Sequence, residues 1–154
     1  MKETGHNEEQ IIVDLYRASR GPVVRIDVQS PKALARLIDL LRAMSEGTAN
    51  ELSLSSLDGI AFTAALTDVR LKLTNSRKES SRSVRLWAQT GVGTVVEWAR
   101  QSEGWLESAE LLDGLNEGPG HQCLSRGFSD DAEIEVSFQE ADAKTRAERL
   151  RGES

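Results

Sequence analysis

The chain has little cysteine, little histidine and few aromatic residues. Its 154 residues include one cysteine and two histidines, and 5% of them are aromatic. One cysteine cannot form an internal disulfide, and it falls short of the ligand set of a structural zinc site. These shortages exclude the small disulfide-framework proteins and the cysteine-rich zinc modules, and they favour a reducing compartment.

Long apolar runs are also missing. No stretch approaches the roughly 18 apolar residues that a membrane span requires, and the polar first ten residues lack the apolar segment of a signal peptide. We therefore expect neither membrane insertion nor export, and we expect a cytoplasmic protein.

The composition is that of a folded globular protein. It is 38% hydrophobic and 29% charged, with a net charge of -6. This sign argues against a general nucleic-acid binder, because such proteins are usually basic. We predict one α+β domain over residues 11–139, a flexible N-terminus over 1–10 and a polar C-terminal tail over 140–154.

Hydrophobic periodicity predicts the first elements. Apolar residues alternate with polar ones within residues 11–28, as in a β-hairpin with one buried face. Ser30-Pro31 is typical of a helix start, since serine accepts from an early backbone N–H and proline has none to lose. The following apolar spacing of three and four predicts a core-facing helix that ends near Gly47.

In the middle of the chain, apolar residues again alternate with polar ones. We expect consecutive antiparallel strands at 52–54, 60–66 and 69–73, then strands at 84–86 and 94–100 joined by Gly91-Val92-Gly93. The two glycines lack the rest of a phosphate-binding signature, so they indicate a hairpin.

A second helix is predicted at 103–115 and short strands at 122–125 and 134–138. The residues expected on its buried side are Trp105, Ser108, Ala109, Leu111, Leu112 and Leu115. The predicted fold is α+β, with an antiparallel β-sheet and two amphipathic helices packed on one face. The residues expected on the solvent-exposed face are Arg25, Asp27, Arg70, Lys72, Arg85, Trp87, Glu97, Glu133 and Glu135.

Few side chains have a spacing that specifies chemistry. His121 and Cys123 would lie on one face of a strand, but catalytic pairs normally come from separate elements and a third orienting residue is lacking. A metal site would combine this pair with Asp130 and Asp131, but the two aspartates are more simply explained as a turn with side-chain hydrogen bonds. We predict no catalytic residue, no metal and no cofactor.

The charge layout is more informative. From Glu97 to Glu135 there are ten acidic residues and two arginines, a net charge of -8. An acidic surface with an apolar residue set into it suits the binding of a basic protein, because carboxylates steer association and the apolar side chain adds affinity. The predicted contact residues are Leu106, Glu107, Glu110, Asp113, Glu133 and Glu135.

Four alternatives remain open. A solvated acidic face needs no partner. The basic segment from Arg70 to Arg85, which includes Arg77, Lys78 and Arg82, could hold a phosphate or a nucleic-acid strand, and Trp87 could be the seam of a homo-oligomer. A small-ligand or enzymatic pocket could also form, and its residues would be His121, Cys123, Trp98 and Trp105.

Part of the sequence resembles a bacterial family. The run Gly118-Pro119-Gly120-His121-Gln122-Cys123-Leu124, the acidic turn with the closing strand Glu133-Ile134-Glu135-Val136-Ser137-Phe138, and more weakly the helix Ser30–Leu37 are similar to immunity proteins of polymorphic toxin systems, in particular the group catalogued as immunity protein 32. This resemblance implies a non-enzymatic cytoplasmic inhibitor that binds a cognate toxin, often by presenting acidic groups to a basic nuclease site.

Overall fold

The computed structural model describes residues 10–19, 21–74, 83–124 and 130–139. These residues form an α+β fold, as the sequence predicts. Neither of the described α-helices has the length and apolar character needed to cross a bilayer. The expected flexible N-terminus and polar C-terminal tail fall almost entirely outside the described residues, and the predicted domain limits stay a prediction.

The first two strands form the predicted hairpin. Strand β1 (Ile11–Ala18) pairs with β2 (Gly21–Val28) in antiparallel register from Ile11 opposite Val28 to Ala18 opposite Gly21. Gly21 has a φ of 128°, which residues with a Cβ rarely adopt, so glycine suits this tight connection.

Helix α1 (Pro31–Ser45) begins as the sequence predicts. The Ser30 side chain accepts a 3.1 Å hydrogen bond from the backbone N–H of Ala33, and Pro31 occupies the first helical position. Its buried side carries Ala33, Leu34, Leu37, Ile38, Leu41 and Met44.

One sheet, sheet A, has five strands in the order β4-β1-β2-β9-β8. The additional strands are β4 (Ile60–Phe62), β8 (Gly120–Cys123) and β9 (Glu133–Phe138). Pairing is mixed, because β4 runs parallel to β1 and β9 runs parallel to β2.

A second sheet, sheet B, has four strands in the order β3-β5-β7-β6. These are β3 (Glu51–Ser53), β5 (Asp68–Leu73), β7 (Gly93–Arg100) and β6 (Val84–Gln89). The hairpin of β6 and β7 confirms the turn predicted at Gly91–Gly93, whereas β5 and β7 pair in parallel.

The α+β class is therefore confirmed, but the single antiparallel sheet is not. The segment expected to supply consecutive antiparallel strands is divided: β3 and β5 pair with each other in sheet B, while β4 joins sheet A. A 3₁₀ turn, Leu54–Ser56, separates β3 from β4. Alternating residues show that a strand has a buried face, but they carry no information about its partner.

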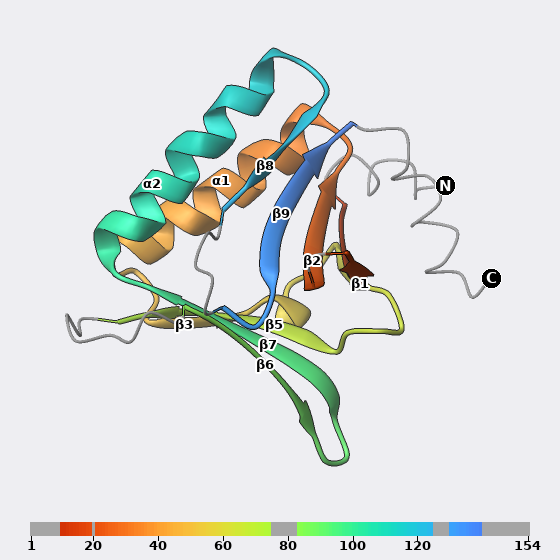
Figure 1. The fold of residues 1–154 in the computed structure, drawn as a ribbon. Helices are drawn as coiled ribbons and strands as arrows, with labels where there is room; N and C mark the ends of the chain where they lie inside the picture. Colours follow the sequence, from red (N-terminus) through yellow and green to blue (C-terminus); the bar gives the residue numbers. More distant parts are fainter. Residues whose placement is uncertain (1–9, 20, 75–82, 125–129, 140–154) are drawn as a thin grey trace.

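Helix α2 (Ser102–Asp113) is continued by the 3₁₀ turn Gly114–Glu117 and packs against α1. Figure 1 shows both helices on one side of sheet A, with sheet B below them. The buried residues of α2 are Trp105, Ser108, Ala109 and Leu112. Leu111 was expected in this set, but it is 38% exposed because it lies at the edge of the buried stripe.

One hydrophobic core joins both helices with the inner faces of both sheets. The expectation of one solvent-exposed sheet face is wrong for sheet A, where Asp27 is 0% exposed and Glu135 is 4% exposed. These carboxylates lie on the face of the sheet turned away from the helices, since their strand neighbours Ile26, Val28, Ile134 and Val136 belong to the core.

The segment before β9 connects the two sheets. The Asp130 carboxylate accepts hydrogen bonds from the backbone N–H groups of Ser83 and Val84, at 2.7 and 3.0 Å. The next residue, Asp131, donates its backbone N–H to the Val84 carbonyl and accepts from the Leu86 N–H through its carboxylate. Both aspartates thus cover the outer edge of β6 up to Leu86.

Candidate functional site

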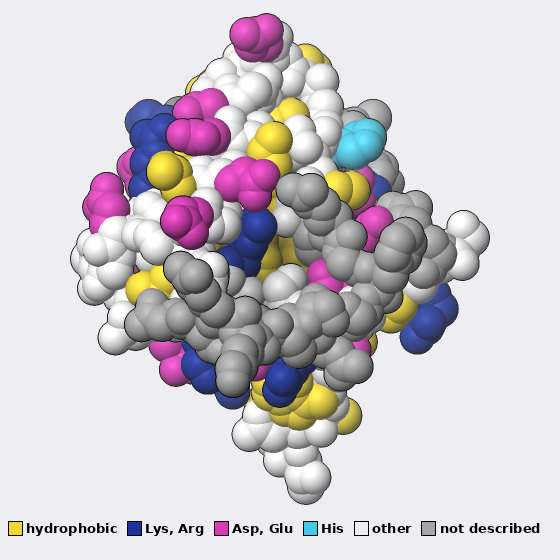
Figure 2. All heavy atoms as spheres, turned by 60° about the vertical axis from the view of Figure 1, so that its left-hand side comes forward, with side chains coloured by type: hydrophobic (Ala, Val, Ile, Leu, Met, Phe, Trp, Pro, Cys, Tyr) yellow, Lys and Arg dark blue, Asp and Glu magenta, His cyan; other side chains and the backbone are white. Residues whose placement is uncertain are grey.

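The outward face of α2 is acidic with exposed leucines. Opposite the buried stripe, the helix presents Glu103, Glu107, Glu110 and Asp113, together with Leu106 and Leu111. Figure 2 shows magenta and yellow side chains interspersed on the face that includes the left-hand side of Figure 1. We call these six residues the α2 face.

Two leucines border the carboxylates of this face. Leu106 is 42% exposed and Leu111 is 38% exposed, and Val92 is the other large exposed hydrophobic residue among those described. At a hundred degrees per residue, the leucines fall on opposite flanks of Glu103, Glu107 and Glu110. Leu106 was predicted from the sequence, whereas Leu111 was missed because the apolar period alone could not fix the width of the buried stripe.

Arginines at the margins pair with two of the carboxylates. Arg100 lies 3.3 Å from Glu107, and Arg42 of α1 lies 3.1 Å from Asp113. Both carboxylates are about half exposed, at 48% and 49%, so these pairs contribute little to stability. Glu103 and Glu110 have no ion-pair partner among the described residues.

The acidic residues of the α2 face are not explained by a need to stabilise the helix. Its last turn contains no basic residue, although the carbonyl end of a helix favours cations and disfavours anions. Carboxylates three or four residues apart also repel one another by a few tenths of a kcal/mol per pair. The acidic residues after Glu103 therefore weaken the helix that carries them, apart from the compensation by Arg100 and Arg42.

Glu133 and Glu135 lie elsewhere. They are on the face of sheet A away from the helices, and the Glu135 side chain is only 6% exposed. Its Oε1 accepts from Arg25 Nε at 3.2 Å and from the Tyr16 hydroxyl at 3.1 Å. The structure thus divides the predicted contact residues: four form part of the α2 face, and the two on β9 do not join it.

Tyr16, Arg25 and Glu135 form a network that sequence reasoning missed. Arg25 donates to the Tyr16 hydroxyl at 2.8 Å, and its guanidinium lies 5.0 Å from the centre of the Tyr16 ring. Burial raises the pKa of Tyr16 above its ordinary value; the hydrogen bond from Arg25 opposes this shift and the Glu135 charge adds to it. The parallel pairing of β2 with β9 brings these residues together, and no local sequence signal reveals that pairing.

The residues of the predicted pocket do not converge. Trp98 and Trp105 are buried in the core, with ring centroids 4.7 Å apart. His121 and Cys123 are exposed on β8, paired with Ser137 and Glu135 on the face of sheet A away from the helices. His121 Nε2 lies 3.9 Å from Glu135 Oε2.

The metal reading also finds no support. Asp130 and Asp131 bind backbone N–H groups of β6, as described above. Within the described ranges, no three histidine, cysteine or acidic side chains gather as a metal site would require.

Two of the three described basic residues between Arg70 and Arg85 form ion pairs within sheet B. Arg70 contacts Asp68 at 3.2 Å, Lys72 contacts Glu97 at 3.5 Å, and Arg85 lies opposite Glu97 in the β6–β7 register. The predicted basic residues Arg77, Lys78 and Arg82 lie outside the described residues. Arg70 and Lys72 thus have internal partners for their charges.

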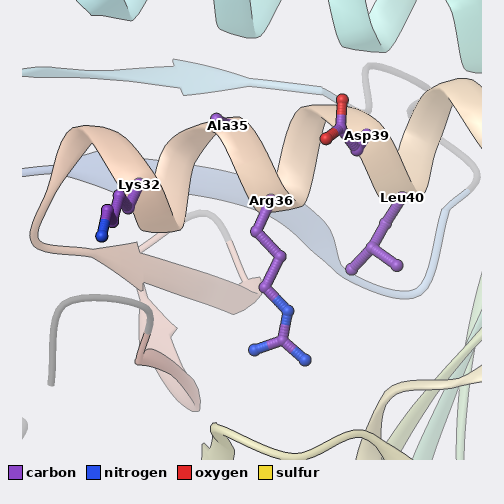
Figure 3. Close-up of a pocket in the computed structure, with 5 residues that line it drawn as sticks. All are labelled: Lys32, Ala35, Arg36, Asp39 and Leu40. Atoms are coloured by element: carbon purple, nitrogen blue, oxygen red, sulfur yellow. The ribbon is translucent and has the colours of Figure 1, made fainter. Parts of the chain in front are cut away.

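A shallow groove of about 390 Å³ lies along α1. Its lining residues are Lys32, Ala35, Arg36, Asp39 and Leu40. Figure 3 shows Arg36 and Leu40 directed to one side of the helix and Asp39 to the other. The described part of this lining comes from one helix surface, which does not enclose a small molecule as a binding cleft does.

Comparisons with protein-family models, curated proteins and solved structures find no match to this chain.

Proposed function

We propose that this chain is a non-enzymatic protein-binding module that docks a basic protein on the α2 face. The observation that carries the proposal is the exposure of Leu106 and Leu111 on either side of helix carboxylates. Exposed apolar side chains next to charge are typical of recognition surfaces.

The two kinds of side chain have different roles in such a contact. Glu103, Glu107 and Glu110 provide the long-range attraction that accelerates association with a basic surface. Leu106 and Leu111 provide apolar area that loses its water when the partner docks, which slows dissociation. Arg100 and Arg42 hold Glu107 and Asp113 in place, so these carboxylates lose less freedom on binding.

Within this class, we propose an immunity-type inhibitor of a cognate toxin. The resemblance of Gly118–Leu124 and Glu133–Phe138 to immunity proteins of polymorphic toxin systems supports this assignment, as does the acidic α2 face. A nuclease that binds phosphates has a basic active site, and a row of helix carboxylates can occupy such a site in place of nucleic acid. An inhibitor of this kind acts in the cytoplasm, the compartment expected from the sequence.

Affinity capture from the host lysate with charge-reversal variants tests this function. Glu107→Lys plus Glu110→Lys reverses the centre of the α2 face. Glu51→Lys plus Asp58→Lys makes the same change in net charge at exposed positions outside both helices. We expect the wild type and the control to retain one basic protein at low salt and to lose it near 0.5 M salt, and the α2 variant to lose it at both.

Retention of the same protein by the α2 variant, or capture of nothing by the wild type at either salt, contradicts the proposal. Circular dichroism of all three proteins shows whether a lost interaction reflects unfolding.

A further inference from the structure

The distal part of the β6–β7 hairpin, from Leu86 to Val96, is an uncharged projection from an otherwise charged molecule. No residue from Leu86 to Val96 is charged, and this is the longest uncharged stretch of the chain. Figure 1 shows the hairpin extending below the body of the molecule. Residues 88–93 are exposed, including Val92 at 43%.

The described residues cover the outer edge of β6 only in part. The Ser83 carbonyl accepts from Ala99 of β7, so by alternation the backbone of Val84, Leu86 and Ala88 faces the opposite side. Asp130 and Asp131 occupy this outer side at Val84 and at the Leu86 N–H. In the described ranges no strand pairs with β6 beyond that point, which leaves the N–H and C=O of exposed Ala88 at an open edge.

Soluble proteins usually protect such an edge with lysine, proline or a bulge. The hairpin from Leu86 to Val96 contains neither lysine nor proline, and its pairing with β7 is regular from Val84 to Gln89. An open and uncharged edge strand is therefore a template for another strand.

We propose that the strand that pairs here is β6 of a second copy of this chain. A two-fold axis between two copies sets their β6 strands side by side in antiparallel orientation. Each residue of β6 then meets the same segment of the other copy. Like charges would repel in such a contact, and the uncharged hairpin avoids this repulsion. With the axis at Ala88, the two Ala88 residues exchange both backbone hydrogen bonds and join two copies of sheet B.

The side chains are compatible with this register. Trp87 of each copy lies diagonally across from Trp87 of the other on the face of sheet B turned away from the core, a separation that aromatic side chains can span. Arg85 lies opposite Gly91 of the other copy, so the two arginines stay apart.

The hairpin is held in place before any partner arrives. Thr67 donates its hydroxyl to the Val92 carbonyl at 3.0 Å and its N–H to the Thr94 carbonyl at 2.8 Å. This bracing reduces the ordering cost of association. Because one strand edge buries a small area, we expect a dissociation constant on the order of 10⁻⁵ to 10⁻⁴ M.

Sedimentation equilibrium of the full chain from about 1 μM to about 1 mM tests the dimer. Ala88→Lys places two ammonium groups directly opposite each other, and we expect it to raise the dissociation constant at least about tenfold. An equimolar mixture of Ala88→Lys with Ala88→Glu should restore association as a heterodimer. Ala35→Lys, at an exposed position on α1, is the matched control and should dimerise like the wild type.

A wild type that stays monomeric over this range overturns the proposal, as does dimerisation unchanged by Ala88→Lys. Failure of the oppositely charged mixture to associate would show that Ala88 does not lie at the axis, which also overturns it.

Discussion

The carboxylate of Asp131 accepts a 2.9 Å hydrogen bond from the backbone N–H of Leu86 and so ties the start of β9 to the outer edge of β6. The two residues belong to segments associated with different sheets and lie 45 positions apart in sequence. The bond satisfies one N–H of a backbone edge that the sheet itself leaves unpaired.

Asp131→Ala should therefore destabilise the fold. It removes the acceptor of the Leu86 N–H, and we expect a loss of about 1–3 kcal/mol in the free energy of unfolding. Urea denaturation measures this loss. Asp39→Ala, at an exposed position on α1, is the control and should change stability by less than about 0.5 kcal/mol. Equal effects of the two substitutions would contradict the role assigned to Asp131.

The Tyr16 phenol should make stability depend on alkaline pH. Burial raises its pKa in the folded state above the value of about 10 found in unfolded chains. The folded protein thus binds this proton more tightly, so the stabilising contribution is complete below about pH 10 and is lost as the pH rises through the folded-state pKa. Tyr16→Phe should remove this component of the alkaline loss.

Phenolate absorbance measures the same group directly, because Tyr16 is the one tyrosine in the sequence. We expect the folded protein to titrate at higher pH than the protein in denaturant. Identical titration curves in the two states would contradict the burial of this phenol.

The two core tryptophans should differ in their tolerance of phenylalanine. The Trp105 indole N–H donates to the Lys72 carbonyl at 3.2 Å, whereas the buried Trp98 N–H has no hydrogen-bond partner among the described residues. Both substitutions remove similar volume, but Trp105→Phe also removes a hydrogen bond, whereas Trp98→Phe removes a buried N–H without a partner among the described residues. We expect Trp105→Phe to cost about 1 kcal/mol more than Trp98→Phe in urea denaturation, and the reverse order would contradict this assignment.

Local signals predicted local structure well. Ser30 and Pro31 marked the start of α1 because capping depends on the residues themselves. The β1–β2 hairpin and the Gly91–Gly93 turn were likewise readable, since short connections join neighbouring strands.

Long-range pairing could not be predicted in this way. The parallel alignment of β2 with β9 places Asp27 and Glu135 on adjacent interior strands of sheet A. Both carboxylates are buried, although alternation assigns them to a solvent-exposed face. The same pairing brings Glu135 to Arg25 and away from the α2 face. Part of the candidate site could nevertheless be predicted from the sequence, because Leu106, Glu107, Glu110 and Asp113 share one side of a single helix.

The most direct test of the proposed function is the association rate of the captured basic protein with this chain, measured at low salt and near 0.5 M salt. We predict that Glu107→Lys plus Glu110→Lys slows association at low salt by at least about tenfold, while Glu51→Lys plus Asp58→Lys changes it by less than about twofold. Equal slowing by both variants would show that net charge alone governs binding, and no slowing by the first would show that the partner binds elsewhere.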